Sequence, residues 1–432
     1  MKSYKSIGTL LTVSLIFSVG CKKKGPTDPP IKEPINEPVV IIKPEPKKRV
    51  HIENKSLSEL IDISTKALDA YAQKNSFHLE SYLYGVDLDK SNPPANPQKT
   101  LFLPNVKKIT PTSANVLAQF SGESIFLPHI ETLDEQSAQN LSTYKGEVLS
   151  LGNLSSLDEY VTNKLSSFSG YVLHLGGNFT LSDFAASNLT RFTGQELYIK
   201  GLTSIDQKTA QELKNFSGDT LFISGLTSID EQSLIALMSY PGQRLSLSGI
   251  TTLDDTQASH LSTFQGSDLY LRGIANITET ELTYLLDYQY NLHLDGINTL
   301  TDAALAKIVA HEEFISLNRL QDPTQQQLSS LAQTEWAHLY LDGIAQLDPT
   351  TASAFSSFEG VLHLNGLRSL NEATAQALLG FQGDEIYLNG ITQLNDDTAA
   401  VICAAEASRI YMYNMQDKTN IQQCSNVKTT ED

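Results

Sequence analysis

The sequence predicts an α/β solenoid, a stack of strand–turn–helix units with a parallel sheet on one face. Three observations carry this prediction: an apolar-x-apolar triplet recurs every 23 to 24 residues, a helix-capping residue follows each triplet, and apolar residues then recur at helical spacing. The length of 432 residues also exceeds what one compact core usually accommodates, which favours a repeat architecture.

The first residues indicate export and attachment to a membrane. Lys2 and Lys5 precede a mostly apolar run that ends at Gly20 and Cys21 and is too short to span a bilayer. A small residue followed by cysteine resembles the bacterial lipoprotein signal, in which the cysteine is lipidated. The resemblance implies a signal peptide over 1–20 and lipidation of Cys21. An ordinary cleaved signal with a chance cysteine is the alternative.

Residues 21–50 predict a tether. Seven prolines prevent helix formation there and favour an extended chain without a recognition role of its own. The next region, 51–100, is expected to cap the N-terminal end of the core, with Ser56–Lys74 as the helical half of an atypical first unit.

The regular units occupy residues 101–412, and a polar tail or cap, 413–432, follows them. Short apolar triplets predict parallel strands whose like-facing side chains enter the core. The units begin at Leu101, Ile125, Leu149, Leu173, Leu197, Leu221, Leu245, Leu269, Leu292, Ile315, Leu339, Leu362, Ile386 and Ile410.

The unit that begins at Leu197 shows how each position serves the fold. Gly201 is expected to permit a turn after the strand, Asp206 to cap a helix, and Gly218 to end that helix. No unit is expected to depart from this pattern far enough to form a pocket. The predicted helix caps are Thr110, Asp134, Asp158, Ser182, Asp206, Asp230, Asp254, Thr278, Thr301, Thr324, Asp348, Asn371 and Asn395.

The period, the Leu-x-Leu strand and the following helix resemble the leucine-rich-repeat family, and with the lipoprotein signal they are similar to repeat proteins displayed by spirochaetes and related bacteria. Leu202 and Ile250 stand where the family has its asparagine ladder, and Gly194 and Gly218 stand where it has leucine. The curvature of the stack is therefore left open. The resemblance implies binding of a protein or of extracellular matrix through the exposed face of the sheet.

The residue between the two apolar residues of each triplet must point away from the core, and in eleven of fourteen units it carries a ring. Such a stripe suits a protein or glycan ligand. Mutual stacking of the rings along the sheet is an equally strong and compatible interpretation. The residues predicted to bind a ligand are Tyr198, Phe222, Tyr270, His293, Tyr340, His363 and Tyr387.

The outward position that follows each strand changes from basic, as at Lys200 and Arg272, to acidic or amide, as at Asp295, Asp342 and Asn389. This change gives polarity to a ligand surface or reflects drift on a solvated face, and drift is favoured. The capping aspartates form an acidic row that is open to calcium, although capping alone explains them.

The three cysteines include no Cys-x-x-Cys pair, so neither a disulfide framework nor a zinc knuckle is predicted. In an exported protein, Cys403 and Cys424 are expected to form a disulfide that holds the tail over the end of the solenoid, with two unpaired thiols as the alternative. No metal site, phosphate loop or nucleophile motif is recognisable, so no cofactor and no enzyme activity are expected.

A net charge of −18 argues against nucleic acid as a partner, and the expected contact with a membrane is made through the lipid anchor. These observations predict an adhesin-like lipoprotein of the bacterial outer membrane, either exposed at the surface or facing the periplasm. A periplasmic structural scaffold is the first alternative, and an enzyme is a more remote one.

Overall fold

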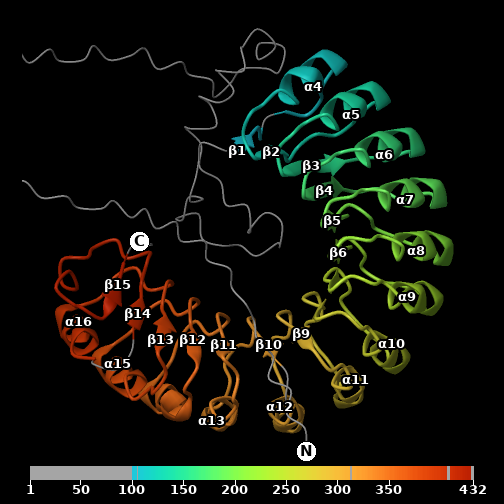
Figure 1. Ribbon diagram of the computed structural model, residues 1–432. Helices are drawn as coiled ribbons and strands as arrows, with labels where there is room; N and C mark the ends of the chain where they lie inside the picture. Colours follow the sequence, from blue (N-terminus) through green and yellow to red (C-terminus); the bar gives the residue numbers. More distant parts are fainter. Residues whose placement is uncertain (1–99, 105, 312–313, 406–408, 430–432) are drawn as a thin grey trace, which may run out of the picture. The chain divides into compact units, whose positions relative to one another are not determined.

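The computed structural model describes residues 100–429, apart from 105, 312–313 and 406–408, and all of these belong to the compact unit Ile52–Asp432. Strands lie along the inner side of a curve and helices along its outer side (Figure 1). The predicted signal peptide, tether and N-terminal cap lie outside the described residues. The α/β solenoid with a leucine-rich-repeat-like alternation of strand and helix is confirmed.

The elements alternate in strict chain order. They are β1 (Thr100–Phe102), α4 (Pro111–Leu117), β2 (Ser124–Leu127), α5 (Glu135–Leu141), β3 (Val148–Leu154), α6 (Glu159–Leu165), β4 (Val172–Gly177), α7 (Asp183–Leu189), β5 (Glu196–Tyr198), α8 (Gln207–Leu213), β6 (Thr220–Phe222), α9 (Glu231–Leu237), β7 (Arg244–Ser246), α10 (Asp255–Leu261), β8 (Asp268–Tyr270), α11 (Glu279–Leu285), β9 (Asn291–His293), α12 (Asp302–Val309), β10 (Ile315–Ser316), α13 (Gln325–Leu331), β11 (His338–Tyr340), α14 (Pro349–Ala352), η2 (Ser353–Ser357), β12 (Val361–His363), α15 (Glu372–Leu378), β13 (Glu385–Tyr387), α16 (Asp396–Cys403), β14 (Arg409–Tyr411) and β15 (Val427–Lys428).

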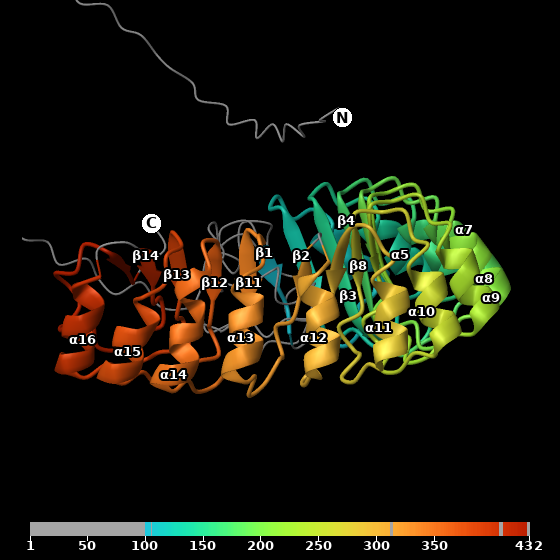
Figure 2. The ribbon, with the colours of Figure 1, turned by 90° about the horizontal axis from the view of Figure 1, so that it is seen from below.

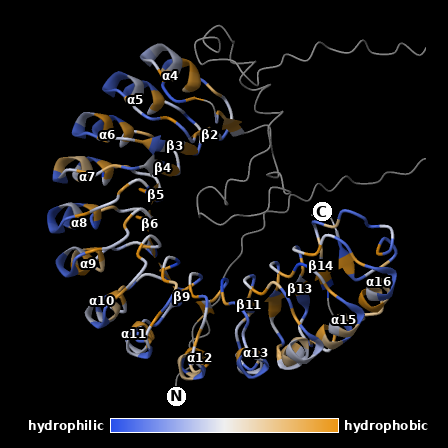
Figure 3. Cartoon of the chain, turned by 180° about the vertical axis from the view of Figure 1, so that it is seen from behind, coloured by the Kyte–Doolittle hydropathy of each residue, from blue (hydrophilic) through white to orange (hydrophobic). Residues whose placement is uncertain are grey.

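The helices begin where the sequence predicts. All thirteen predicted capping side chains accept a hydrogen bond from a backbone N–H in the first turn. The helices stand side by side in Figure 2, and their hydrophobic sides face the strands while hydrophilic residues face outward (Figure 3). The amphipathic spacing therefore buries one face of each helix against the sheet.

A column of aromatic rings, here called the aromatic spine, runs through the core between the helices and the strands. Successive rings are 6.1 to 6.4 Å apart and nearly parallel. The buried tyrosines of this column donate to glycine carbonyl groups of the preceding unit, as Tyr240 does to Gly218 at 2.8 Å. The spine consists of Phe120, Tyr144, Phe168, Phe192, Phe216, Tyr240, Phe264 and Tyr288.

The prediction that Gly218 ends a helix is wrong, and this glycine instead makes room for a ring of the aromatic spine. Helix α8 already ends at Leu213, with Lys214 in right-handed conformation as its C-cap, so Gly218 does not end the helix. A Cβ atom at Gly218 would lie 2.3 Å from Cζ of Phe216 and 2.7 Å from the carbonyl oxygen of Gln195. Glycine is required there because the ring and the preceding unit leave no room for a side chain.

The strands pair in parallel and in register, but the sheet is interrupted once. Strands β1 to β10 form one sheet, and strands β11 to β15 form a second sheet. Arg319 follows β10 where neighbouring units have glycine, and a Cβ atom at the equivalent Gly296 would lie 2.2 Å from the carbonyl oxygen of Arg272. The tenth unit therefore cannot pack like its neighbours, and the sheet is interrupted directly after it.

Candidate functional site: the inner face of the sheet

The seven residues predicted to bind a ligand all lie on the inner side of the curve, but they differ in exposure. Tyr198, Phe222 and Tyr270 are only 0, 2 and 9% exposed, whereas His293 is partly exposed. The three buried rings pack with one another and with Phe126 in a second hydrophobic cluster, separate from the main core. The prediction that the whole stripe is exposed is therefore wrong over β5 to β8, because these side chains pack in an apolar cluster of their own.

The predicted stripe takes a different form over β11 to β14. Tyr340, His363, Tyr387 and Tyr411, here called the ring ladder, are all partly exposed. Their ring centroids are 4.1, 4.5 and 4.4 Å apart, and successive planes differ by 16° or less. The rings stack face to face, so they offer ring edges and polar atoms to a partner more than open faces. The stacking interpretation of the stripe is confirmed here, and the binding of a ligand by these residues stays a prediction.

A carboxylate holds the end of the ring ladder. Glu385 lies two residues before Tyr387 on β13 and therefore projects from the same side of the sheet. Its two oxygen atoms accept hydrogen bonds from the hydroxyls of Tyr387 and Tyr411, each at 3.1 Å. Burial raises the pKa of Tyr387, and the bond to Glu385 raises it further. Sequence reasoning missed Glu385, although the same alternation that selects Tyr387 also selects it.

His338, at the start of β11, contacts His363 of the ring ladder. Its Nδ1 atom lies 3.3 Å from Nε2 of His363. Burial, together with the smaller effect of the neighbouring His338, lowers the pKa of His363 to about 4. The His363 imidazole is consequently neutral at physiological pH, while the rings of Tyr340 and Tyr387 on either side fix its plane.

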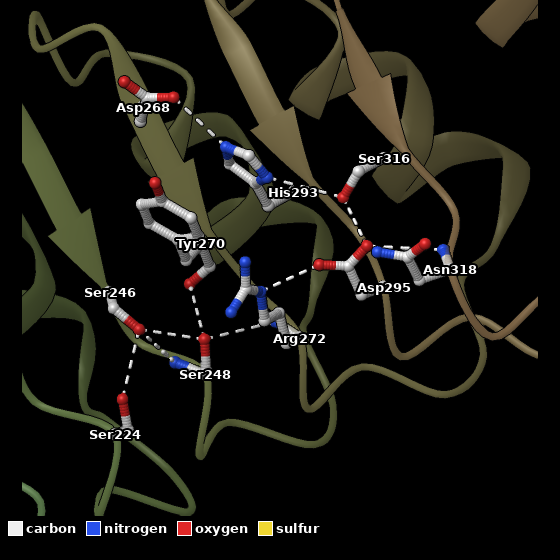
Figure 4. Close-up of polar contacts among 10 residues, drawn as sticks. All are labelled: Ser224, Ser246, Ser248, Asp268, Tyr270, Arg272, His293, Asp295, Ser316 and Asn318. Atoms are coloured by element: carbon white, nitrogen blue, oxygen red, sulfur yellow. Dashed lines mark hydrogen bonds and ion pairs between the residues drawn. The ribbon is translucent and has the colours of Figure 1, made fainter. Parts of the chain in front are cut away.

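A network of polar side chains lies on strands β7 to β10 and in the turns that follow them (Figure 4). Arg272 pairs with Asp295 at 2.8 Å and lies over the ring of Tyr270, and that ring stacks on His293 at 4.0 Å. Burial acts to raise the pKa of Asp268, but hydrogen bonds from His293, Ser267 and Asn291 outweigh it and lower that pKa. The network thus keeps Asp268 charged, and it pairs Asp295 with Arg272.

One chain of contacts in the network has the residue types of a hydrolase relay. Asp268 Oδ1 lies 3.1 Å from His293 Nε2, and His293 Nδ1 lies 3.4 Å from the hydroxyl of Ser316 (Figure 4). The Ser316 hydroxyl, however, donates to Asp295, and the residue is only 3% exposed. Its proton is therefore directed away from His293, and a substrate cannot reach it readily. This geometry favours a structural role for Ser316 over nucleophilic catalysis.

The outward position after each strand also has a structural role. In four units an Asp or Asn side-chain oxygen there accepts a hydrogen bond from the backbone N–H of the equivalent residue one unit later. Interpreting these residues as drift missed this asparagine-like ladder, which lies two positions before the family's usual one. Its bonds run from Asn318 to Asp295 at 3.3 Å, from Asn365 to Asp342 at 2.8 Å, from Asn389 to Asn365 at 3.1 Å and from Tyr413 to Asn389 at 2.9 Å.

The C-terminal tail closes the second sheet. Cys403 and Cys424 form a disulfide with 4.8 Å between their Cα atoms, and β15 pairs in parallel with β14. Ile421 is buried in the core, and Asn426 donates to the carbonyl of Ile402. The tail therefore covers the last unit with an additional strand.

The remaining sites considered from the sequence are the lipidated cysteine and the row of capping aspartates. Cys21 falls outside the described residues. Within residues 100–429, none of the helices is long and apolar enough to cross a bilayer. Among the described residues, no three or more His, Cys, Asp or Glu side chains gather as a metal-binding group. Asp206, Asp230 and Asp254 each accept a hydrogen bond from a backbone N–H in the first turn of a helix.

Comparison with known proteins finds similarity in solved structures alone. No protein-family model and no curated protein matches the sequence. An internalin from Listeria monocytogenes is 16% identical with a TM-score of 0.35, over 73% of this chain and 92% of that chain. A leucine-rich-repeat protein from Leptospira interrogans is 16% identical with a TM-score of 0.37, over 82% and 87%. The TLR13–ssRNA13 complex is 16% identical with a TM-score of 0.40, over 76% and 56%. At these TM-scores the likeness carries no weight of its own, and the fold assignment rests on the units of this chain.

Proposed function

We propose that this chain is a lipid-anchored protein of the bacterial outer membrane that binds a protein ligand in an adhesin-like role, using the inner face of β11 to β14. The ring ladder is the observation that carries the proposal. Its rings are partly exposed, closely stacked and held by Glu385, so little conformational entropy is lost when a partner binds.

The chemistry of this face favours a polar protein partner. Stacked rings present tyrosine hydroxyls and imidazole nitrogens at regular intervals, next to the Glu385 carboxylate. Aromatic side chains of this kind dominate the binding energy of protein interfaces. A glycan is the alternative ligand, and the closed stacking disfavours it because sugar rings prefer an open aromatic face.

The experiment for ligand binding is a screen of the purified chain against an array of extracellular proteins and glycans. The test variant is Tyr340→Ser with Tyr387→Ser, and the control is Phe184→Ser on the outer side, where Phe184 is 72% exposed. The proposal expects protein ligands that are lost in the double variant and retained in the control. Ligands that persist in the double variant, or the absence of any ligand, would overturn it.

The location is tested separately, by protease shaving of intact cells of the native host. Surface display predicts loss of the solenoid without lysis, and Cys21→Ala is expected to release the chain from the membrane fraction. Complete protection of the solenoid would instead favour a periplasmic scaffold.

A further inference from the structure

We propose that His338 and His363 together bind a zinc ion on the inner face of the second sheet. The inference is independent of the adhesin-like role, because it depends on two side chains and not on a partner. The nitrogen atoms that face one another, Nδ1 of His338 and Nε2 of His363, are 3.3 Å apart. Two imidazoles at bond lengths of about 2.0 to 2.1 Å in a tetrahedral zinc site have their nitrogens about 3.3 to 3.4 Å apart.

The two rings also have the order that a metal site needs. His363 is held between Tyr340 at 4.1 Å and Tyr387 at 4.5 Å, and His338 lies over Tyr340 at 5.7 Å with 16° between the planes. Both histidines are therefore oriented before a metal binds, which lowers the entropic cost of binding. Neutral imidazole is the form that coordinates zinc.

The same contact, without metal, is a hydrogen bond in which one ring donates its N–H to the other. When zinc binds, the donating ring moves that proton to its other nitrogen, and both facing lone pairs then coordinate the ion. No third His, Cys, Asp or Glu of the described residues joins the pair. Two coordination positions are consequently left for water or for a group supplied by a bound partner.

The test is isothermal titration of the metal-free full chain with Zn²⁺. Wild type is expected to show one site, and both His338→Gln and His363→Gln are expected to weaken it by at least about tenfold. His260→Gln on α10 is the matched control, because His260 contacts Glu231 on the outer side and should leave the isotherm unchanged. Circular dichroism checks each fold, and the exposed His338 keeps the test valid if the His363 variant unfolds.

Cobalt provides a second measurement. Co²⁺ in a tetrahedral site absorbs strongly in the visible range, and Trp336, the single tryptophan, lies two residues before His338, so its quenching reports binding nearby. Absorption and quenching that both disappear in His338→Gln support the site. An isotherm that is the same in all variants, or no binding to wild type, would show that the contact is a hydrogen bond alone.

Discussion

Truncation of one ring in the aromatic spine tests how the units are held together. Phe216 is fully buried, with Phe192 on one side at 6.3 Å and Tyr240 on the other at 6.4 Å. In Phe216→Ala the two neighbouring rings remain fixed in their own units and cannot fill the space. A buried Phe→Ala change costs about 3 to 5 kcal/mol, and because this cavity cannot collapse we expect about 4 kcal/mol.

The matched control is Phe184→Ala on α7, which removes the same side chain from a position that is 72% exposed. It should change stability by no more than about 0.5 kcal/mol. The free energy of unfolding is measured by urea denaturation followed by circular dichroism, with the slope reported separately because a damaged solenoid can lose cooperativity. A cost below about 1 kcal/mol for Phe216→Ala would refute the conclusion that the spine is tightly packed.

Three further outcomes are expected. Tyr240→Phe leaves a buried carbonyl oxygen without its donor and should cost about 1 to 3 kcal/mol by urea denaturation, and no measurable cost would contradict the hydrogen bond. The bond from Ser233 lowers the pKa of Asp230, so this carboxylate stabilises the fold above its unfolded pKa of about 4 and ceases to do so as pH falls through the lower folded value. The stability advantage of wild type over Asp230→Asn should therefore shrink between pH 7 and pH 3, and an advantage independent of pH would exclude this linkage. Reduction of the Cys403–Cys424 disulfide, which spans 21 residues, should destabilise the C-terminal cap by about 3 kcal/mol, measured as faster amide exchange near β15, and unchanged exchange would show that the cap holds without it.

The sequence was sufficient for the local structure because each signal acts within one unit. Asp206 and the other capping residues bind a backbone N–H three residues away, and this needs no knowledge of the remaining fold. The alternation of apolar residues likewise determines which side of a strand faces the core. The parallel register then follows, since identical units stack best when Leu197 lies beside Leu221.

Contacts between units were harder to predict. The close approach that requires Gly218, and the misfit of Arg319, depend on how near one backbone lies to the next. Alternation shows that Phe222 points out of the main core, but whether it is exposed depends on packing beyond its own strand. The pairing of His338 with His363 likewise combines different positions in two units, which a comparison of equivalent positions does not reveal.

Site-specific photocrosslinking in cells of the native host tests whether the ring ladder is the surface that contacts a partner. A photoreactive phenylalanine analogue replaces Tyr387 on the inner face in one strain and Phe184 on the outer side in another. If the ring ladder contacts the partner, a discrete, light-dependent adduct forms from position 387 and none forms from position 184. Adducts from 184 alone, or equal adducts from both positions, would contradict it.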